Sequence, residues 1–229
     1  MEAIIGYLNG IIWSSALIYL CLGTGLYFSL RTKFLQVRHF GHMLSTLFQG
    51  RSSDAGVSSF QALTMSLSGR VGTGNIAGVA TAIAIGGPGA VFWMWTVAFF
   101  GAATAYVEAT LAQIYKEKDD SGSYRGGPAY YIEKSMGQNW YAWTFAVATV
   151  IAMGFCLPGI QANSIAAAME NAWSLPVEYT AVALATGLFL IVVGGVKRIA
   201  HFAQVAVPVM AVGYIAISLA VVVANIEMV

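Results

Sequence analysis

The chain has 229 residues, of which 58% are hydrophobic and only 9% are charged, and its formal net charge is +1. A water-soluble domain carries about 25% charged residues because its surface must stay hydrated. This composition therefore predicts an integral membrane protein, and the low net charge excludes the basic surface that nucleic-acid binding needs. Cys21 and Cys156 lie in apolar runs and are expected to be small buried packing residues rather than a disulfide or a metal site.

Six apolar stretches are long enough to cross a hydrocarbon core of ~30 Å, which takes about 20 helical residues. In chain order they are Ile11–Leu30, Ser58–Gly86, Gly89–Ile114, Trp140–Ala168, Val177–Val196 and Phe202–Ala224. Between the third and fourth spans, Lys116 to Ser123 is expected to form a solvated turn and Pro128 to Met136 a short interfacial helix. The sequence thus predicts an all-α membrane protein with six transmembrane helices.

Lysine and arginine concentrate in alternate connections between these spans. They follow the first, third and fifth spans: Arg31, Lys33, Arg38, Arg51, Lys116, Lys118, Arg125, Lys134, Lys197 and Arg198. The other side carries Glu2, Glu170, Glu178 and Glu227 but no lysine or arginine. Because basic loops stay in the cytoplasm, the N-terminus is expected to lie outside. The chain ends at Val229 directly after a span, which suggests a piece of a longer protein.

The centre of the second span reads Ser68-Gly-Arg-Val-Gly-Thr-Gly-Asn-Ile-Ala-Gly, where a lipid-facing helix would carry leucine or isoleucine. Glycine costs about 1 kcal/mol relative to alanine in a helix interior and permits other backbone conformations. The sequence therefore predicts a break in this span. An unwound stretch survives in the membrane only where its peptide groups find partners. Freed N–H groups suit a carboxylate, and freed carbonyls suit a sodium ion.

These glycines have a plainer interpretation, in which Gly74 and Gly78 form a small-xxx-small pair that lets two unbroken helices approach closely. Three glycines within six residues, together with Arg70, Thr73 and Asn75, favour the break instead. A dinucleotide-binding fingerprint is excluded because the spacing is not G-x-G-x-x-G and no strand precedes it.

Four segments carry a resemblance to a known family: Ser66 to Ile83, Gly86-Gly-Pro-Gly-Ala, Arg125-Gly-Gly-Pro-Ala-Tyr-Tyr-Ile and Leu157-Pro-Gly-Ile-Gln-Ala-Asn. Through them the chain resembles the alanine or glycine:cation symporter family, which has the leucine-transporter fold. The resemblance implies an inverted-repeat transporter of five plus five helices preceded by one extra helix. Residues 1–57 would be that extra helix with its cytoplasmic loop, and residues 58–229 the first repeat, with the second repeat absent.

The resemblance also implies roles for residues at the break. Gly72, Thr73, Gly74 and Asn75 would receive the carboxylate and amino group of an amino acid, and the backbone carbonyls of Ser68 and Val71 would contribute to a sodium site. Gln161 would direct its side chain at the substrate. Its alternative role is an interhelical hydrogen bond, which is worth about 1 kcal/mol in membranes.

Arg70 and Glu108 are charged residues within predicted spans, where a charge needs a partner or water. A structural ion pair between them is the plain expectation, and a pair in an inner gate is the alternative. Both are expected toward the cytoplasmic half of the membrane.

The function that these observations imply is sodium-coupled symport of a small neutral amino acid, alanine or glycine, across a bacterial or archaeal cytoplasmic membrane. The expected partners are the amino acid, sodium as coupling ion and the lipid bilayer, with no further cofactor and no obligate protein partner. A proton-coupled transporter and a channel are the alternatives. An enzyme is not expected, because neither H-E-x-x-H nor G-x-S-x-G occurs.

Overall fold

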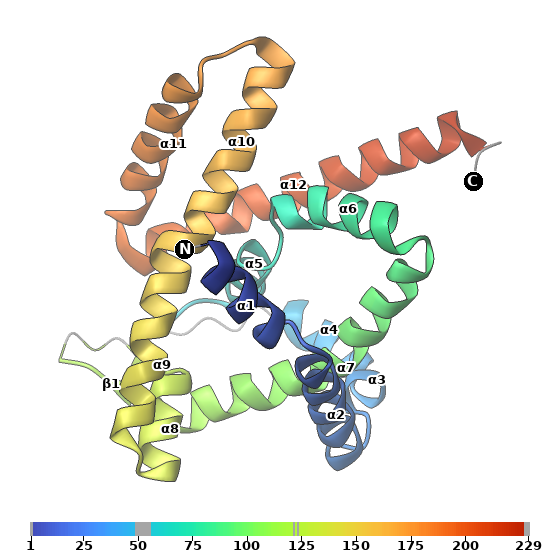
Figure 1. Ribbon diagram of the computed structural model, residues 1–229. Coiled ribbons are helices and arrows are strands. Elements are labelled where there is room, and N and C mark those ends of the chain that lie inside the picture. Colours follow the sequence, from blue (N-terminus) through green and yellow to red (C-terminus); the bar gives the residue numbers. More distant parts are fainter. Residues whose placement is uncertain (1, 49–55, 121, 123, 227–229) are drawn as a thin grey trace. The chain divides into compact units, whose positions relative to one another are not determined.

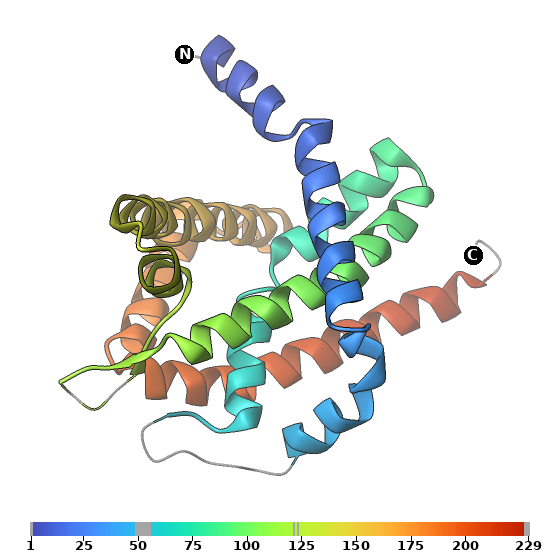
Figure 2. The same cartoon turned by 90° about the horizontal axis from the view of Figure 1, so that it is seen from below.

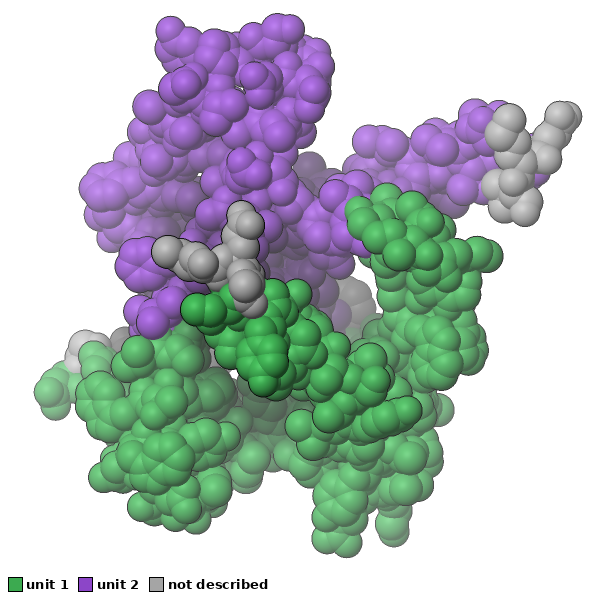
Figure 3. Space-filling model, in the orientation of Figure 1, with its two compact units in different colours: residues 1–44, 79–149 green, residues 45–78, 150–229 purple. Residues whose placement is uncertain are grey.

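The computed structural model describes residues 2–48, 56–120, 122 and 124–226. Regular structure in these residues is helical apart from one short hairpin (Figure 1). Contacts divide the chain into two compact units (Figure 3): unit 1 holds residues 1–44 and 79–149, and unit 2 holds residues 45–78 and 150–229. Arg51 and Glu227, on which the predicted topology partly depends, lie outside the described residues.

Helices of very different lengths follow one another along the chain. In order, the elements are α1 Glu2–Ile12, α2 Ser15–Arg31, α3 Leu35–Arg38, α4 Phe40–Phe48, α5 Ser59–Ser68, the 3-10 helix η1 Thr73–Asn75, α6 Ala77–Gly86, α7 Gly89–Ile114, β1 Glu117–Lys118, β2 Tyr124–Arg125, α8 Pro128–Met136, α9 Asn139–Ile151, the π-helical segment η2 Ala152–Cys156, α10 Leu157–Trp173, α11 Val177–Val192 and α12 Gly195–Ala224.

Four helical segments are long and apolar enough to cross a membrane: Ile4–Arg31, Gly89–Ile114, Asn139–Trp173 and Gly195–Ala224. Each contains one of the predicted spans, and the third predicted span has the bounds of α7. The remaining two predicted spans correspond to shorter helices, namely the pair α5 and α6 and the 16-residue α11. The all-α class is confirmed, whereas the number of six spans and the inverted repeat stay predictions.

In unit 1, α2 packs closely against α7 (Figure 2). Gly25 makes this approach possible, because a Cβ there would lie 2.9 Å from Phe100 Cβ and 3.0 Å from the Phe100 backbone. Ser29 and Ala103 are buried, at 0% and 2% exposure. Small side chains therefore bring two apolar helices together where lipid offers no hydrophobic driving force for association.

The connection from α7 to α8 also lies in unit 1, and in it β1 pairs with β2 as a two-stranded antiparallel hairpin. Ser121 and Ser123 of the predicted solvated turn lie outside the described residues. An ion pair of 2.6 Å joins Lys134 Nζ of α8 to Glu117 Oε1 of β1. The short helix is confirmed with the predicted bounds, Pro128–Met136, whereas its place at the membrane interface stays a prediction. On it, burial raises the pKa of the Tyr131 hydroxyl, and Glu108 and Tyr141 raise it further. Tyr131 therefore stays a neutral hydrogen-bonding group at physiological pH.

In unit 2, α5 packs against the first half of α12 (Figure 2). Gln61 Nε2 donates to Gln204 Oε1 at 3.1 Å, and Thr64 and Ala200 are buried at 1% and 0% exposure. The helices α10 and α11 also lie side by side (Figure 1). These contacts fix α5, which leads into the break, and α10, which carries Gln161.

Large apolar side chains are exposed along the long helices, as at Val209 and Ile217 of α12 with 68% and 67% exposure. Such surfaces are stable in hydrocarbon rather than in water. Cys21 and Cys156 are free thiols, and both are exposed, so the prediction that they are buried is wrong. A transmembrane helix is apolar on its lipid-facing side as well as on its packed side, and an apolar sequence context therefore does not indicate burial.

Candidate functional site

The predicted break in the second span is confirmed. Helix α5 begins with a capping box, in which Gln61 N–H donates to Ser58 Oγ at 3.2 Å and Ser58 N–H donates to Gln61 Oε1 at 3.0 Å. It ends at Ser68, and the next regular turn is the three-residue η1. Helix α6 then starts at Ala77. Unbroken helix from Leu67 through Val79, as a simple small-xxx-small contact requires, is excluded.

Two peptide groups of the break are satisfied by Asn75. Its Oδ1 accepts from Gly72 N–H at 3.0 Å, and its own N–H donates to the Gly72 carbonyl at 3.0 Å. Asparagine side chains stabilise turns by such local bonds to the backbone. Asn75 therefore holds the tight turn at the start of η1.

The next peptide group is satisfied from a distant helix. Gln161 Oε1 of α10 accepts from Thr73 N–H at 2.9 Å and from Thr73 Oγ1 at 2.8 Å. Gly72 makes room for this contact, because a Cβ there would lie 2.5 Å from Gln161 Nε2. A hydroxyl and a backbone N–H of one residue thus converge on a single oxygen.

Other peptide groups of the break stay open. In the described part of the chain no donor bonds the carbonyls of Ser68 and Val71, because the last helical bonds run from Gly69 to Met65 and from Arg70 and Val71 to Leu67. Unpaired carbonyls of this kind suit a monovalent cation, since unwound backbone carbonyls coordinate sodium in discontinuous-helix transporters.

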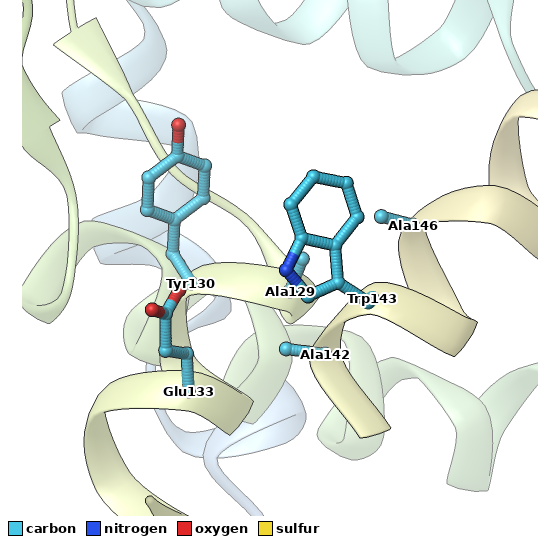
Figure 4. A pocket seen from close by; sticks show the side chains of 6 residues that line it. All are labelled: Ala129, Tyr130, Glu133, Ala142, Trp143 and Ala146. Atoms are coloured by element: carbon cyan, nitrogen blue, oxygen red, sulfur yellow. The ribbon is translucent and has the colours of Figure 1, made fainter. Parts of the chain in front are cut away.

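A cavity of about 240 Å³ lies elsewhere, in unit 1, between α8 and α9. In Figure 4 the rings of Tyr130 and Trp143 stand across this cavity from one another, with Glu133 beside Tyr130. Its lining carries one carboxylate and no basic side chain. A zwitterion needs a partner for its own carboxylate, so this cavity fits an amino acid less well than the break does.

The cavity at the break has a volume of about 530 Å³ and lies within unit 2. It is lined by Ser68, Gly69, Arg70, Val71, Gly72, Gly74, Asn75, Met153, Leu157, Pro158 and Gln161. Of the seven residues predicted to bind substrate or sodium, all but Thr73 line this cavity. Thr73 itself hydrogen-bonds Gln161, which is part of the lining. The structure therefore brings the seven predicted substrate and sodium residues together, while their roles stay predictions.

Sequence reasoning missed Met153, Leu157 and Pro158, which also line this cavity. A signal for them is present: Met153, Leu157 and Gln161 recur every four residues, the spacing of one helix face. Pro158 and the π-helical segment Ala152–Cys156 lie in the same part of the chain. Such π-bulges are frequent at functional sites.

Arg70 Nη1 donates to Ser66 Oγ at 2.9 Å, one helical turn earlier in unit 2. Glu108 lies on α7 in unit 1, where its charge acts on Tyr131. The ion pair between Arg70 and Glu108 stays a prediction.

These features define the class of the protein. Four apolar helical segments of spanning length indicate a multi-pass membrane protein. A helix that is interrupted beside a cavity, with open backbone carbonyls at the break, is typical of secondary transporters.

The chain belongs to the sodium:alanine symporter family, whose profile matches residues 1–229. The members of this family are transporters rather than enzymes. The chain is 59% identical over 227 residues to YrbD of Bacillus subtilis (strain 168), provisionally named a sodium/proton-dependent alanine carrier; the match covers 99% of this chain and 47% of the relative.

Two further relatives differ in their named substrates. GlnT of Bacillus subtilis (strain 168), provisionally named a sodium/glutamine symporter, is 46% identical, and the match covers 99% of this chain and 48% of the relative. The sodium/alanine symporter AgcS of Methanococcus maripaludis is 38% identical, with 98% of this chain and 51% of the relative covered. The chain spans about half the length of these relatives.

Proposed function

We propose that the chain works in a sodium-coupled symporter that carries a small neutral amino acid, alanine or glycine, across the cytoplasmic membrane. The proposal depends mainly on one observation: both donors of Thr73 converge on a single oxygen, Gln161 Oε1, and the carbonyls of Ser68 and Val71, a few residues earlier in the same break, accept no bond. The first arrangement suits a carboxylate oxygen and the second a sodium ion. Gly72, Gly74 and Asn75 complete the substrate side of the break.

Small substrates fit this site because the break contributes little side-chain bulk. Neither Gly74 nor Gly78 has any atom within 4 Å of a Cβ built on it, so space is open beside the backbone. Peptide N–H groups in an environment with little water bind an anion more strongly than they do in water. The amino acid would thus be held by its main-chain groups, and its side chain would enter the open space beside these glycines.

Sodium would supply the driving force. Its carbonyl ligands at Ser68 and Val71 lie on the loop that leads directly to Gly72 and Thr73. An ion that orders these carbonyls also fixes the N–H groups that follow, so sodium and substrate favour each other's binding. Inward movement of the cation contributes about 2.3 kcal/mol per 100 mV of membrane potential.

A proton-coupled transporter is the second candidate, because the names of two relatives mention the proton beside sodium. A protein of Bacillus sp. (strain PS3), 49% identical over 193 residues, is named a sodium/proton-dependent alanine carrier; the match covers 81% of this chain and 41% of that protein. The described residues of the break include no carboxyl side chain that could carry the proton. Sodium is therefore the coupling ion that this site supports.

The test is uptake of radiolabelled alanine by the full-length protein in liposomes. An inward sodium gradient should drive accumulation, and replacing sodium by choline at constant pH should abolish it. Uptake that persists in choline and follows a proton gradient would reject sodium coupling. Competition by unlabelled glycine, serine and glutamine then defines the substrate, because only small amino acids should compete strongly.

The orientation belongs to the same proposal, with the N-terminus outside and the basic connections in the cytoplasm. Single cysteines at Lys118 of the hairpin and at Glu178 of α11 lie on opposite predicted sides. Each cysteine is introduced into a version of the protein that has no other cysteine. In intact cells, a membrane-impermeant maleimide should then label Glu178→Cys but not Lys118→Cys. The reverse pattern would overturn the orientation.

A further inference from the structure

The proposed function leaves the cavity between α8 and α9 without a role. Its volume of about 240 Å³ is below the roughly 300–1,000 Å³ of pockets that hold drug-sized ligands. Half of its lining consists of alanines, namely Ala129 of α8 and Ala142 and Ala146 of α9, which leave the space that larger side chains would fill. The cavity therefore suits a small molecule or the headgroup of a larger one.

Two aromatic rings and one carboxylate supply the chemistry of this cavity (Figure 4). Tyr130 and Glu133 are three residues apart and share one face of α8, and Trp143 of α9 stands across the cavity from Tyr130. The Trp143 ring is 72% exposed and contacts no other ring in the described residues, whereas the Trp140 and Tyr141 ring centroids lie 5.8 Å apart. The face of the Trp143 ring is therefore available to a ligand.

The carboxylate of Glu133 has no ion pair in the part of the chain that the structure describes. The next residue, Lys134, pairs with Glu117 instead, at 2.6 Å, and Arg125 of the hairpin pairs with Asp119 at 3.0 Å. The lining residues include no lysine or arginine. The negative charge of Glu133 thus lies beside aromatic rings, whose faces are also electrostatically negative.

We infer that the cavity between α8 and α9 binds an organic ammonium ion, such as the head of choline or ethanolamine. Cations are attracted to the faces of tryptophan and tyrosine rings, and cages of such rings recognise quaternary ammonium groups. The neighbouring hairpin already contains one contact of this kind, in which Lys116 Nζ lies 4.5 Å from the centre of the Tyr124 ring. The cavity belongs to unit 1 and the break to unit 2, so the inference does not depend on the proposed function.

Other ligand classes fit these residues less well. A hard metal ion such as calcium needs six to eight oxygen ligands, and the described residues contain no group of three His, Cys, Asp or Glu side chains that could hold a metal. An anion would be repelled by Glu133 and by the ring faces. The carboxylate of a zwitterion would meet the same repulsion.

The first experiment measures binding of radiolabelled choline to the purified full-length protein in detergent. Trp143→Leu and Glu133→Gln should each raise the Kd by about two- to fivefold, as expected for one exposed cation–π contact or ion pair. Tyr130→Phe keeps the ring and should leave the Kd unchanged. The matched controls are Trp140→Leu on α9, where the ring is 70% exposed outside the cavity, and Glu170→Gln on α10.

The chemical control is the neutral isostere of choline, in which carbon replaces the charged nitrogen. It should not displace choline, and displacement as strong as that by choline itself would show a merely apolar pocket and overturn the inference. Equal Kd values for Trp143→Leu and Trp140→Leu would also overturn it, because Trp143 would then serve only as one of the aromatic residues that line a membrane interface.

A second experiment separates a free solute from a lipid headgroup, since α8 is predicted to lie at the membrane interface. Native mass spectrometry compares retention of phosphatidylethanolamine and phosphatidylglycerol that carry the same acyl chains. A preference for phosphatidylethanolamine that is lost in the double variant Glu133→Gln, Trp143→Leu would identify the lipid as the ligand, and choline binding without such a preference would identify a free solute. Absence of both would overturn the inference, whereas the proposed function would still be tested separately by alanine uptake.

Discussion

The fit between Gly72 and Gln161 makes a sharp prediction for Gly72→Ala. The backbone at Gly72 is extended, with φ of −154° and ψ of −174°, so alanine fits this conformation without strain. The added Cβ, however, would lie 2.5 Å from Gln161 Nε2 and 3.1 Å from its Cδ and Oε1. The amide is the end of a flexible side chain, so the Gln161 side chain should move away while the backbone at Gly72 stays in place.

The magnitude follows from the contacts that this withdrawal breaks. Optimal contact with a carbon atom is about 3.5–4.0 Å, so the amide must move by about an ångström. Both bonds to Thr73, now 2.9 and 2.8 Å long, are then lost. At about 0.5–1.5 kcal/mol each, their loss favours local opening by about 1–3 kcal/mol, which is a factor of about 5 to 150.

Hydrogen exchange measured by mass spectrometry reports this opening at the Thr73 amide, without any substrate. The control is Gly74→Ala, two residues further on, where a Cβ meets nothing within 4 Å. Both changes reduce the conformational entropy of the unfolded chain equally. The difference in Thr73 exchange between the two variants therefore reports the displacement of Gln161 alone. Equal exchange at Thr73 in the two variants would refute the reasoning.

Two further variants test packing within each unit. Gly25→Ala should separate α2 from α7 at Phe100, which costs about 1–3 kcal/mol and lowers the melting temperature in detergent by several degrees. The control Gly23→Ala adds a Cβ that meets nothing within 4 Å and should leave the melting temperature unchanged. Equal melting temperatures of the two variants would contradict the close approach. Gln204→Leu removes the partner of Gln61 and should cost about 1 kcal/mol of stability. This loss should lower the melting temperature in detergent, and an unchanged melting temperature would show that the bond contributes nothing.

The sequence was sufficient to predict the break because its cause is local. Glycines at 69, 72 and 74 weaken the helix whatever surrounds them, and the structure ends α5 at Ser68 and resumes regular helix at Ala77. The cause of the short helix Pro128–Met136 is equally local, with proline at its first position and Gly137 just past its end. Proline at N1 and glycine at C′ are strong boundary signals.

Other element boundaries could not be predicted from the sequence, because hydropathy does not depend on backbone geometry. The run from Asn139 to Trp173 reads as one apolar span, yet five of its residues, Ala152–Cys156, form a π-helix. Similarly, α12 begins at Gly195, so Lys197 and Arg198 belong to its first turn rather than to a loop. Lysine and arginine are good helix formers, and their charges mark a membrane boundary without ending a helix.

The partner of the break shows the limit most clearly. Composition indicates that Thr73 has a freed N–H, but the acceptor is 88 residues away, and glutamine is equally suited to a substrate or to another helix. The contact that the structure shows depends on packing: the missing Cβ of Gly72 admits the Gln161 amide, and Thr73 then offers it two donors. Glycine thus acts twice in this segment, since it unwinds the helix and also makes room for the side chain that satisfies the unwound backbone. A substitution that keeps the break but fills that space therefore separates the two effects.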